Sequence, residues 1–448
     1  MDGLAPLTDV AIDPGAARIY EHGWQSWSPT TTYRVDQRPL RPVVPARRVL
    51  CYRPERAAPD DAFQGEGLLA VQPEADGPVL VFAARDGRGP IPSIRAEARG
   101  NRLVVSTDGP VDTITDAGPG GIDGALARWA DRFAARMGVA GIRRAPTGWC
   151  SWYHYFTRVT EADMLENLEW IDRLALPIEV VQLDDGYEAE IGDWLTLSNR
   201  FTSLQDLIGR IRAAGRRAGI WVAPFLVGAR SQLAATHPDW LVGPPGQPVD
   251  AGYNWGQQLY ALDTTHPGAR AYLAEVFGTF HTWGIDYFKI DFIYAGAIPG
   301  RRSADVPALA AYRDGVQLIR DAIGDSYLLG CGAPILASVG LFDAMRISPD
   351  TAPYIEPRDG DLSQPSSRAA IITGVGRAFQ QGRFWVNDPD CLIVRPSVEG
   401  REAWAAHVAR YGGLRASSDR LAELDDWGLG VTRWLLSESP TAPFVPST

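Results

Sequence analysis

The sequence is poor in the features that mark several large classes of protein. No apolar run approaches the ~18 residues that a membrane span requires. The chain begins Met1-Asp2-Gly3-Leu4-Ala5-Pro6, which lacks the basic and apolar regions of a signal peptide, so we expect a cytoplasmic protein. A net charge of -11 gives no basic surface for nucleic acid and no reason to expect binding to anionic membranes.

Metal and cofactor ligands are also scarce. The four cysteines are too few and too scattered for a disulfide framework and form no CxxC pair, so we expect free thiols at Cys51, Cys150, Cys331 and Cys391. The six histidines form no HExxH motif and no cluster with cysteine, which argues against zinc. No GxGxxG follows a predicted strand, which weakens a nucleotide-binding interpretation. We expect neither a metal nor an organic cofactor.

What is present fits a soluble globular protein of two parts. With 448 residues, the chain can hold a barrel of about 250 residues and a smaller domain. Apolar content of 45% and charged content of 22% are ordinary for a globular protein. The fifteen tryptophans are many for this length. Some will fill a core, and we expect others to form platforms for sugar rings.

The first region, residues 1–122, is predicted to be a small antiparallel β domain. Apolar runs at 79–82 and 103–105 are separated by turn signals such as Asp76-Gly77 and Asp86-Gly87. A glycine-rich joint follows, and then a helical linker over 123–144. Its apolar residues recur at helical spacing: Leu126, Trp129, Phe133 and Met137.

Residues 145–436 alternate between predicted strands and helices, which indicates a parallel sheet in an α/β fold. The strands are predicted at 148–151, 178–184, 219–225, 287–293, 327–331, 344–348, 383–387 and 411–416. Helices fit between them, for instance at 161–174, 204–218 and 267–283. Eight such units predict a (β/α)₈ TIM barrel. The Pro- and Ser-rich residues 437–448 are predicted to form a loose tail.

Carboxylates end two of these predicted strands. Asp291 ends the run 287–291, and Lys289, two residues earlier, should project from the same face of the strand. Asp350 ends the run 344–350. Because a barrel does its chemistry at the carboxyl ends of its strands, these two carboxylates are predicted to share a site. Two carboxylates are the minimal equipment for cleaving a glycosidic bond.

Other polar and aromatic residues also fall at predicted strand ends. Asp184 and Asp185 are adjacent, so keeping both ionised requires hydrogen-bond donors or a cation. They are predicted to bind substrate, although one of them could instead cap the next helix. Trp149 and Trp221 lie at strand positions, where a core role and a pocket role are about equally supported.

Three further features concern the later strands. Cys331 lies between two glycines, where backbone could approach a ligand closely. Arg346 lies inside an apolar strand, four residues before Asp350, and could hold a carboxylate or a hydroxyl. The acidic run at 387–391 predicts either a rigid Asx-type turn that supports the barrel rim or a direct ligand contact.

Taken together, residues 148–390 resemble glycoside hydrolase family 36, and within it the bacterial α-galactosidases. The resemblance rests on the order of five motifs: Gly148-Trp149-Cys150-Ser151-Trp152, Asp184-Asp185-Gly186-Tyr187 with the later Gly192-Asp193-Trp194, Lys289-Ile290-Asp291, Gly330-Cys331-Gly332 and the run from Met345 to Pro353. The early Gly23-Trp24-Gln25-Ser26-Trp27-Ser28 is similar to the family's amino-terminal β domain. Two differences are a shorter amino-terminal region and a carboxy-terminal β domain that is absent or vestigial.

The resemblance implies retaining hydrolysis of terminal α-galactosides, with Asp291 as nucleophile and Asp350 as general acid/base. In a retaining enzyme these two carboxyl groups should lie about 5–5.5 Å apart. Lys289 is expected to keep the pKa of Asp291 low. The substrate-binding roles implied are hydroxyl contacts, including axial O4, for Asp184 and Asp185, further hydroxyls for Lys289 and Arg346, a pocket lining for Trp149 and Trp221, and a border near O2 for Cys331.

Three alternatives remain open from the sequence. A transglycosylase similar to raffinose synthase would use the same aspartates with an acceptor sugar in place of water. The same fold could instead hydrolyse α-N-acetylgalactosaminides or α-glucosides. A carbohydrate-binding protein without turnover is disfavoured because both predicted catalytic aspartates are present. Neither the oligomeric state nor an approach of Trp24 or Trp27 to the pocket can be predicted.

Overall fold

The first strands of the chain form two antiparallel sheets that pack face to face. The structure, a computed structural model, describes residues 3–53 and 55–446. The sheets have the orders β1 (Ala5–Ala11), β8 (Arg102–Thr107), β7 (Ser93–Arg99), β4 (Phe63–Glu66) and β3 (Thr31–Arg34), β2 (Arg18–Glu21), β5 (Leu68–Gln72), β6 (Val79–Ala83), β9 (Asp112–Asp116). Alternating side chains such as Leu103 and Val105 fill the core between them. This small antiparallel domain confirms the predicted β region.

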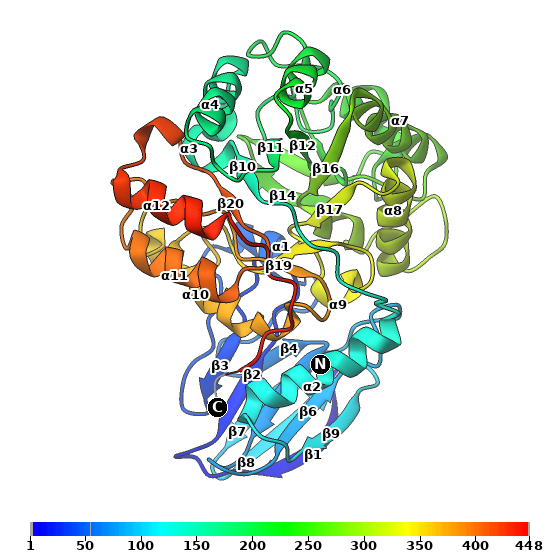
Figure 1. Cartoon of the computed structure of the whole chain (residues 1–448). Helices are drawn as coiled ribbons and strands as arrows, with labels where there is room; N and C mark the ends of the chain where they lie inside the picture. Colours follow the sequence, from blue (N-terminus) through cyan, green and yellow to red (C-terminus); the bar gives the residue numbers. More distant parts are fainter. Residues whose placement is uncertain (1–2, 54, 447–448) are drawn as a thin grey trace.

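A helix joins the sandwich to the barrel. Gly120 and Gly121, with φ of 88° and 53°, make the left-handed turn that leads into α2 (Gly121–Met137). The side chains at helical spacing, Trp129 and Phe133 among them, are buried against β5 and β6. Figure 1 shows α2 lying along the sandwich on the side that faces the barrel. Two short helices precede it within the sandwich region, η1 (Pro45–Arg47) and α1 (Arg48–Cys51).

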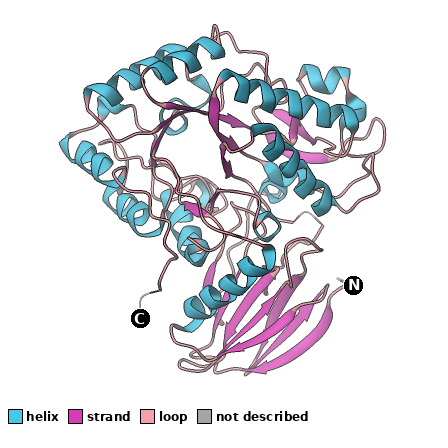
Figure 2. Ribbon diagram, turned by 45° about the vertical axis from the view of Figure 1, so that its right-hand side comes forward, coloured by secondary structure: helices cyan, strands magenta, loops and turns pink. Residues whose placement is uncertain are grey.

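Eight parallel strands then form the barrel, which Figure 2 shows as a ring surrounded by helices. In sheet order they are β19 (Val386–Asp388), β18 (Ala344–Arg346), β17 (Tyr327–Gly330), β16 (Ile285–Ile290), β12 (Arg217–Val222), β11 (Val180–Leu183), β10 (Gly148–Cys150) and β20 (Ala416–Ser417). The ring closes where the N–H groups of Gly413 and Leu414 both donate to the carbonyl of Asn387, at 3.0 Å. Each strand overlaps a predicted one, so the (β/α)₈ prediction is confirmed.

The barrel helices and 3₁₀ turns follow their strands in order. They are α3 (Trp152–Tyr155), η2 (Phe156–Arg158), α4 (Glu161–Arg173), α5 (Leu204–Ala213), α6 (Gln232–Thr236), η3 (Pro238–Trp240), α7 (Pro267–Trp283), η4 (Ile293–Ala297), α8 (Ala308–Ile323), α9 (Ile335–Ser338), η5 (Arg358–Gly360), α10 (Ser367–Gly376), η6 (Ala378–Gln380), α11 (Arg401–Tyr411), η7 (Leu421–Glu423) and α12 (Asp426–Leu435). A capping box between Thr160 and Asp163 starts α4. The helix predicted over 204–218 ends five residues early, because the chain turns at Gly215 (φ 75°) and enters β12.

A second sheet rises from the barrel between β12 and α7, and the sequence did not predict it. Its strands, in the order β13 (Leu226–Gly228), β15 (Gln257–Ala261), β14 (Asp250–Asn254), are antiparallel. They are only three to five residues long, and β14 has no alternation of buried and exposed side chains. Such short segments carry too little periodicity to be distinguished from loops.

The end of the chain also differs from prediction. Residues 437–446 are not loose: the N–H of Phe444 donates to the carbonyl of Gln381 at 3.2 Å, and its ring lies 5.6 Å from that of Tyr411. Residues 447–448 of the predicted tail lie outside the described residues, as do Met1 and Asp2 of the amino-terminal prediction. Between β20 and residue 446 the structure contains η7 and α12 and no strand. No helix in residues 3–53 and 55–446 has the length and apolar character needed to cross a membrane.

Candidate active site

Asp291 directly follows β16, and two donors fix its side chain. The indole N–H of Trp221, on β12, donates to Oδ2 at 3.0 Å. The main-chain N–H of Phe292 donates to Oδ1 at 2.8 Å. Phe292 itself has a φ of 52°, which is uncommon for a bulky residue and is typical of positions that serve a site. The carboxylate of Asp291 is therefore held in one orientation at the carboxyl end of the barrel.

Asp350 lies in the loop after β18 and is the more accessible of the two carboxyl groups. Its side chain is 31% exposed and accepts a hydrogen bond from Nη1 of Arg346 at 2.9 Å. Loss of solvation raises the pKa of Asp350, Arg346 lowers it, and the negative charge of Asp291 raises it again. The net shift is upward. Asp291 and Asp350 therefore interact electrostatically, as two carboxyl groups of one site do.

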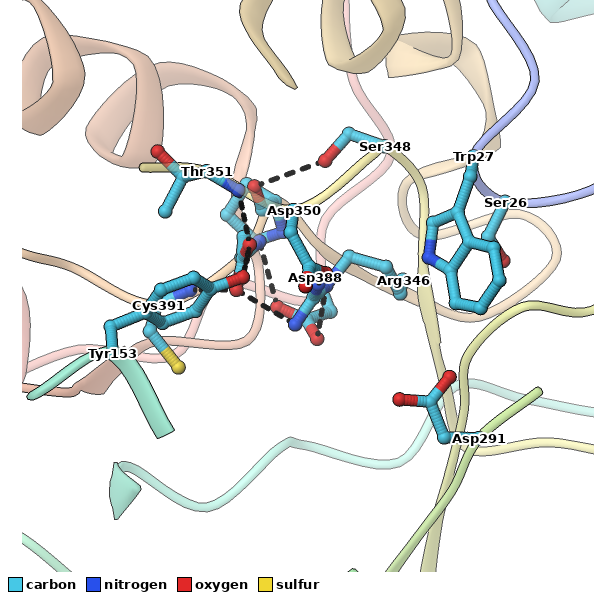
Figure 3. A network of polar contacts seen from close by, with 12 residues as sticks. Ser26, Trp27, Tyr153, Asp291, Arg346, Ser348, Asp350, Thr351, Asp388 and Cys391 are labelled. Carbon is cyan, nitrogen blue, oxygen red and sulfur yellow. Dashed lines mark hydrogen bonds and ion pairs between the residues drawn. The ribbon is translucent and has the colours of Figure 1, made fainter. Parts of the chain in front are cut away.

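Arg346 binds three carboxylates, which we call the carboxylate cluster: Asp350, Asp388 and Asp390. Its Nε contacts Asp388 at 3.2 Å and its Nη2 contacts Asp390 at 2.7 Å. Figure 3 shows Arg346 beside Asp350 and Asp388. The N–H of Asp390 donates to Oδ1 of Asp388 at 2.9 Å, which is the Asx-type turn that the acidic run predicted. Arg346 thus holds carboxylates, one of the two roles that the sequence left open.

The adjacent aspartates at the end of β11 have different surroundings. Asp184 accepts hydrogen bonds at Oδ2 from Nζ of Lys289 at 2.9 Å and from Nε2 of Gln182 at 2.7 Å. Asp185 accepts one from the indole N–H of Trp255 at 2.7 Å. Burial, and then the neighbouring charge of Glu188, raise the pKa of Asp185 well above its usual value. Neither aspartate caps a helix, since α5 begins at Leu204 with Ser203 as its cap.

Lys289 supplies a cation to Asp184, whereas the sequence left open whether donors or a cation would serve the acidic pair. It is buried, and its ion pair is with Asp184 rather than with Asp291, its predicted partner. Burial alone would lower the pKa of Lys289, but Asp184 outweighs it and the net shift is upward. Lys289 is also the single lysine among the chain's 43 basic residues. The chain thus uses the compact ammonium group of lysine, with its three donors, at position 289 alone, and the larger guanidinium group of arginine at every other such position.

An arc of aromatic rings borders Asp291 and comes from three parts of the fold. Trp221 of β12 is 6.3 Å from Trp255, at the tip of the β14–β15 hairpin. Trp255 is 5.0 Å from Phe292, and Phe292 is 4.8 Å from Trp27 of the sandwich, all between ring centroids. The indole N–H of Trp27 is buried and has no hydrogen-bond partner among the described residues. In Figure 3 its nitrogen is turned toward Arg346.

Trp27 reaches this position because a docking loop, residues 23–28, packs into the barrel. The N–H of Ser26 donates to the carbonyl of Ala333 at 3.2 Å, and the N–H of Ile335 donates to that of Trp24 at 3.0 Å. Gly332, with a φ of 57°, leaves room for the Trp27 ring, since a Cβ there would lie 2.9 Å from it. Trp24 instead lies under the guanidinium of Arg53, 5.5 Å from the ring centroid. Of the two tryptophans, Trp27 is the one beside Asp291.

Trp149 and Cys331 are fully buried. The indole N–H of Trp149 donates to the carbonyl of Asp419 at 2.9 Å, inside the barrel, so this side chain has no exposed surface for a sugar. The structure does not support its predicted pocket role. Cys331 follows β17, and its N–H donates to the carbonyl of Ile290 at 2.8 Å. Burial raises the pKa of the Cys331 thiol well above its usual value, so it remains protonated.

Sequence reasoning missed several residues of this site. Trp255 and Tyr153 were not singled out, and Trp27 was left undecided. In residues 3–53 and 55–446, no three His, Cys, Asp or Glu side chains are grouped so that they could hold a metal ion.

Comparison with known proteins gives partial matches in sequence. Residues 149–305 match the Melibiase family model. The chain is 31% identical over 158 residues to an α-galactosidase of Escherichia coli, and 34% identical over 87 residues to α-galactosidase AgaA of Geobacillus stearothermophilus. These segments cover 31% and 18% of this chain. They span 21% and 12% of the relatives' own lengths, respectively.

Comparison of structures covers nearly the whole chain. TtGalA, an α-galactosidase from Thermus thermophilus solved in complex with p-nitrophenyl α-D-galactopyranoside, matches with a TM-score of 0.80 and 33% identity. The match includes 96% of this chain and 88% of that one. The family 36 α-galactosidase AgaA shares the fold at 15% identity, with a TM-score of 0.66 over 97% of this chain and 62% of its own. The chain therefore belongs to the family of the melibiases, the α-galactosidases of glycoside hydrolase family 36.

Proposed function

We propose that this protein is a retaining α-galactosidase that hydrolyses terminal α-D-galactosyl residues of galacto-oligosaccharides by double displacement. The observation that carries the proposal is the pairing of Asp291 and Asp350 after β16 and β18, which β17 separates in the sheet. One carboxylate is fixed by two donors and the other has a raised pKa. TtGalA, which resembles this chain over most of its length, was solved with stachyose as well.

In the first step, Asp291 attacks the anomeric carbon while Asp350 donates its proton to the departing glycosidic oxygen. A bond forms between an Asp291 oxygen and the sugar, and the bond to the aglycone breaks. Trp221 and the N–H of Phe292 aim the attacking carboxylate. The raised pKa keeps the proton on Asp350 until it is needed.

In the second step, the esterified Asp291 no longer carries a charge, so one cause of the raised pKa of Asp350 is gone. Asp350 then accepts a proton from water, and the resulting hydroxide equivalent attacks the anomeric carbon. The sugar leaves with its α configuration, and Asp291 is again a carboxylate.

The remaining polar groups fit recognition of a galactose ring. Asp184, Asp185 and Lys289 present buried charges to sugar hydroxyls, which exchange hydrogen bonds with carboxylates and ammonium groups at such sites. The free N–H of Trp27 adds a donor from the sandwich. Cytoplasmic location and an α-galactoside as the small-molecule partner are part of this proposal.

The test is to assay the protein with nitrophenyl α-galactoside, α-glucoside and α-N-acetylgalactosaminide beside the variant Asp291→Ala. Cleavage of the galactoside alone, lost in the variant and restored by azide as a β-galactosyl azide, supports both the sugar and the nucleophile. Proton NMR should show the α anomer of galactose appearing first. Cleavage of another glycoside alone would overturn the specificity, and a β first product would overturn the retaining mechanism.

A further inference from the structure

Two carboxylates of the cluster share the ends of one guanidinium but are bonded very differently. Asp390 has four partners: an ion pair with Nη2 of Arg346 at 2.7 Å, and hydrogen bonds from the N–H of Thr351 at 2.7 Å, the N–H of Cys391 at 2.6 Å and the hydroxyl of Tyr153. The side chain of Asp350 accepts from Arg346 alone among the described residues. Asp390 is completely buried, whereas Asp350 is 31% exposed.

We propose that Asp390 is a positioning residue for the proton: it carries the negative charge that these two carboxylates share, and so leaves the proton on Asp350. The inference rests on the proposed role of Asp350 as general acid. It adds a residue outside the predicted substrate contacts, reached through Arg346.

The donors explain why the charge rests on Asp390. Hydrogen bonds to a carboxylate favour its ionised form, and three of the four partners of Asp390 can only donate. Burial and the charges of Asp350 and Asp388 raise the pKa of Asp390 to about 7, against the opposing effects of Arg346 and Tyr153. Asp350 also has a raised pKa, so the two groups compete for one proton as a coupled pair. Asp350 has a single donor, so its ionised form gains less from hydrogen bonding than that of Asp390 does.

The charge on Asp390 also acts on Asp350 in two ways. It repels a second negative charge nearby, and it draws the guanidinium of Arg346 toward itself, which weakens the pull of Arg346 on Asp350. The other groups that act on the pair are the same in the wild type and in Asp390→Asn. They are Asp291, Lys289, Asp184, Asp388, Tyr153 and Arg346.

The experiment is the pH profile of kcat/KM for Asp390→Asn. Asp390 has a φ of 91°, and asparagine tolerates positive φ well, so the backbone should be kept. Without the charge, the alkaline limb, which reports loss of the proton from the general acid, should move down by about one pH unit. At pH values above the alkaline limb, kcat/KM of the variant should be about tenfold below that of the wild type for such a shift. At pH values below the limb, kcat/KM should change much less.

The proposal would be overturned if kcat/KM fell by the same factor at all pH values, or if the alkaline limb stayed in place or moved to higher pH. Asp390 would then have a structural role only. Asp388→Asn provides a second variant should Asp390→Asn fail to fold. Asp388 contacts Arg346 more loosely, at Nε and 3.2 Å, so the same downward shift is expected with a smaller size. Full-length wild-type protein is the reference in each series.

A spectroscopic titration separates this inference from the proposed function. The infrared difference between wild type and Asp350→Asn isolates the C=O band of the protonated Asp350 carboxyl without turnover. A matched difference, Asp390→Asn against the double variant, should lose the band about one pH unit lower. Loss at the same pH in both would refute the role of Asp390 even if galactosides are cleaved. Should no glycoside be cleaved, the band still shows where the proton rests.

Discussion

Two buried arginines lie close to the site and have opposite kinds of partner. Arg346 binds the three carboxylates of the cluster. Arg377, directly after α10, donates only to main-chain carbonyls, one from Ile347 and four from the docking loop: those of Gly23, Gln25, Ser26 and Ser28. No described carboxylate forms an ion pair with Arg377. The positive charge of Arg346 is thus neutralised by carboxylates, whereas that of Arg377 is stabilised only by the dipoles of main-chain carbonyl groups.

The difference shows in their electrostatics. Burial alone would lower the pKa of Arg346, but Asp390 and Asp388 outweigh it, and the net shift is upward. Burial lowers the pKa of Arg377 to about 9, since no carboxylate compensates for it. We infer that Arg346 offsets the negative charge of the carboxylate cluster as Asp350 gains and loses its proton. Arg377 fixes the shape of the loop that presents Trp27, because its five-donor guanidinium spans carbonyls that no single ammonium could reach.

The largest expected effect comes from Arg346→Met, which leaves buried carboxylates without their cation. Removing one partner of a buried pair typically costs about 3–5 kcal/mol of stability. The unpaired Asp388 and Asp390 should then have raised folded-state pKa values, so the stability of the variant is better kept at low pH and is lost as pH rises through those values. Urea unfolding at pH 5 and pH 8 measures both effects.

Arg346→Lys is the matched control, since it keeps a charge but has three donors on one nitrogen. It should recover part of the stability at pH 8 and little of the activity. A loss in Arg346→Met that is the same at pH 5 and pH 8 would contradict the assignment of Arg346 to charge balance.

Arg377→Met should have a smaller effect on stability, about 1–3 kcal/mol, with a different signature. Main-chain carbonyls lose their donors, but an uncompensated buried charge is removed at the same time. The docking loop should loosen and Trp27 with it, so KM should rise while the alkaline limb of kcat/KM stays in place. Steady-state kinetics across pH, with urea unfolding beside them, distinguish this from the cluster variants.

Arg377→Lys tests whether shape or charge matters there. It keeps the charge but cannot reach all five carbonyls, so it should resemble Arg377→Met in KM. A shifted pH profile in either variant would break the comparison, because it would give Arg377 a part in proton balance.

The sequence predicts the fold well because each barrel strand is an apolar run bounded by turns, with a helix of recognisable periodicity after it. It also predicts that Asp291 and Asp350 share a site, since a barrel gathers the carboxyl ends of its strands. The sheet of β13, β14 and β15 was missed because its strands are short and mixed in polarity. Trp255 was missed with it, as the tip of an unpredicted hairpin.

Long-range partners could not be predicted from local patterns. The motif that contains Trp27 lies more than 260 residues before Asp291, and only the docking of the sandwich brings the two together. Lys289 was predicted to act on Asp291 from the same strand, but its ion pair is with Asp184, which follows β11, two strands away in the sheet. One signal was available and unused. The chain has a single lysine, and it lies at the end of a predicted strand. This indicates a position at which arginine cannot replace lysine.

The smallest expected effect is on the pH dependence of stability and concerns His22, which lies beside Arg377 and directly before the docking loop. Its imidazole is buried, and Nδ1 is 3.0 Å from the hydroxyl of Tyr20. Burial, and then the charge of Arg377, lower its pKa well below the usual 6.5. The unfolded chain therefore binds a proton that the folded one excludes, and stability should fall as pH drops below 6.5, by up to about 1.4 kcal/mol per pH unit.

His22→Gln should flatten that acid slope while keeping a partner for Tyr20. His407 on α11 provides the control, because burial is the one cause that lowers its pKa, to about 4. His407→Gln should flatten the slope through burial alone. In Arg377→Met, the slope from His22 should lessen while that from His407 persists. Chemical unfolding from pH 7 to pH 4 measures these slopes. If Arg377→Met changed the slopes from His22 and His407 equally, the charge of Arg377 would not act locally on the docking loop.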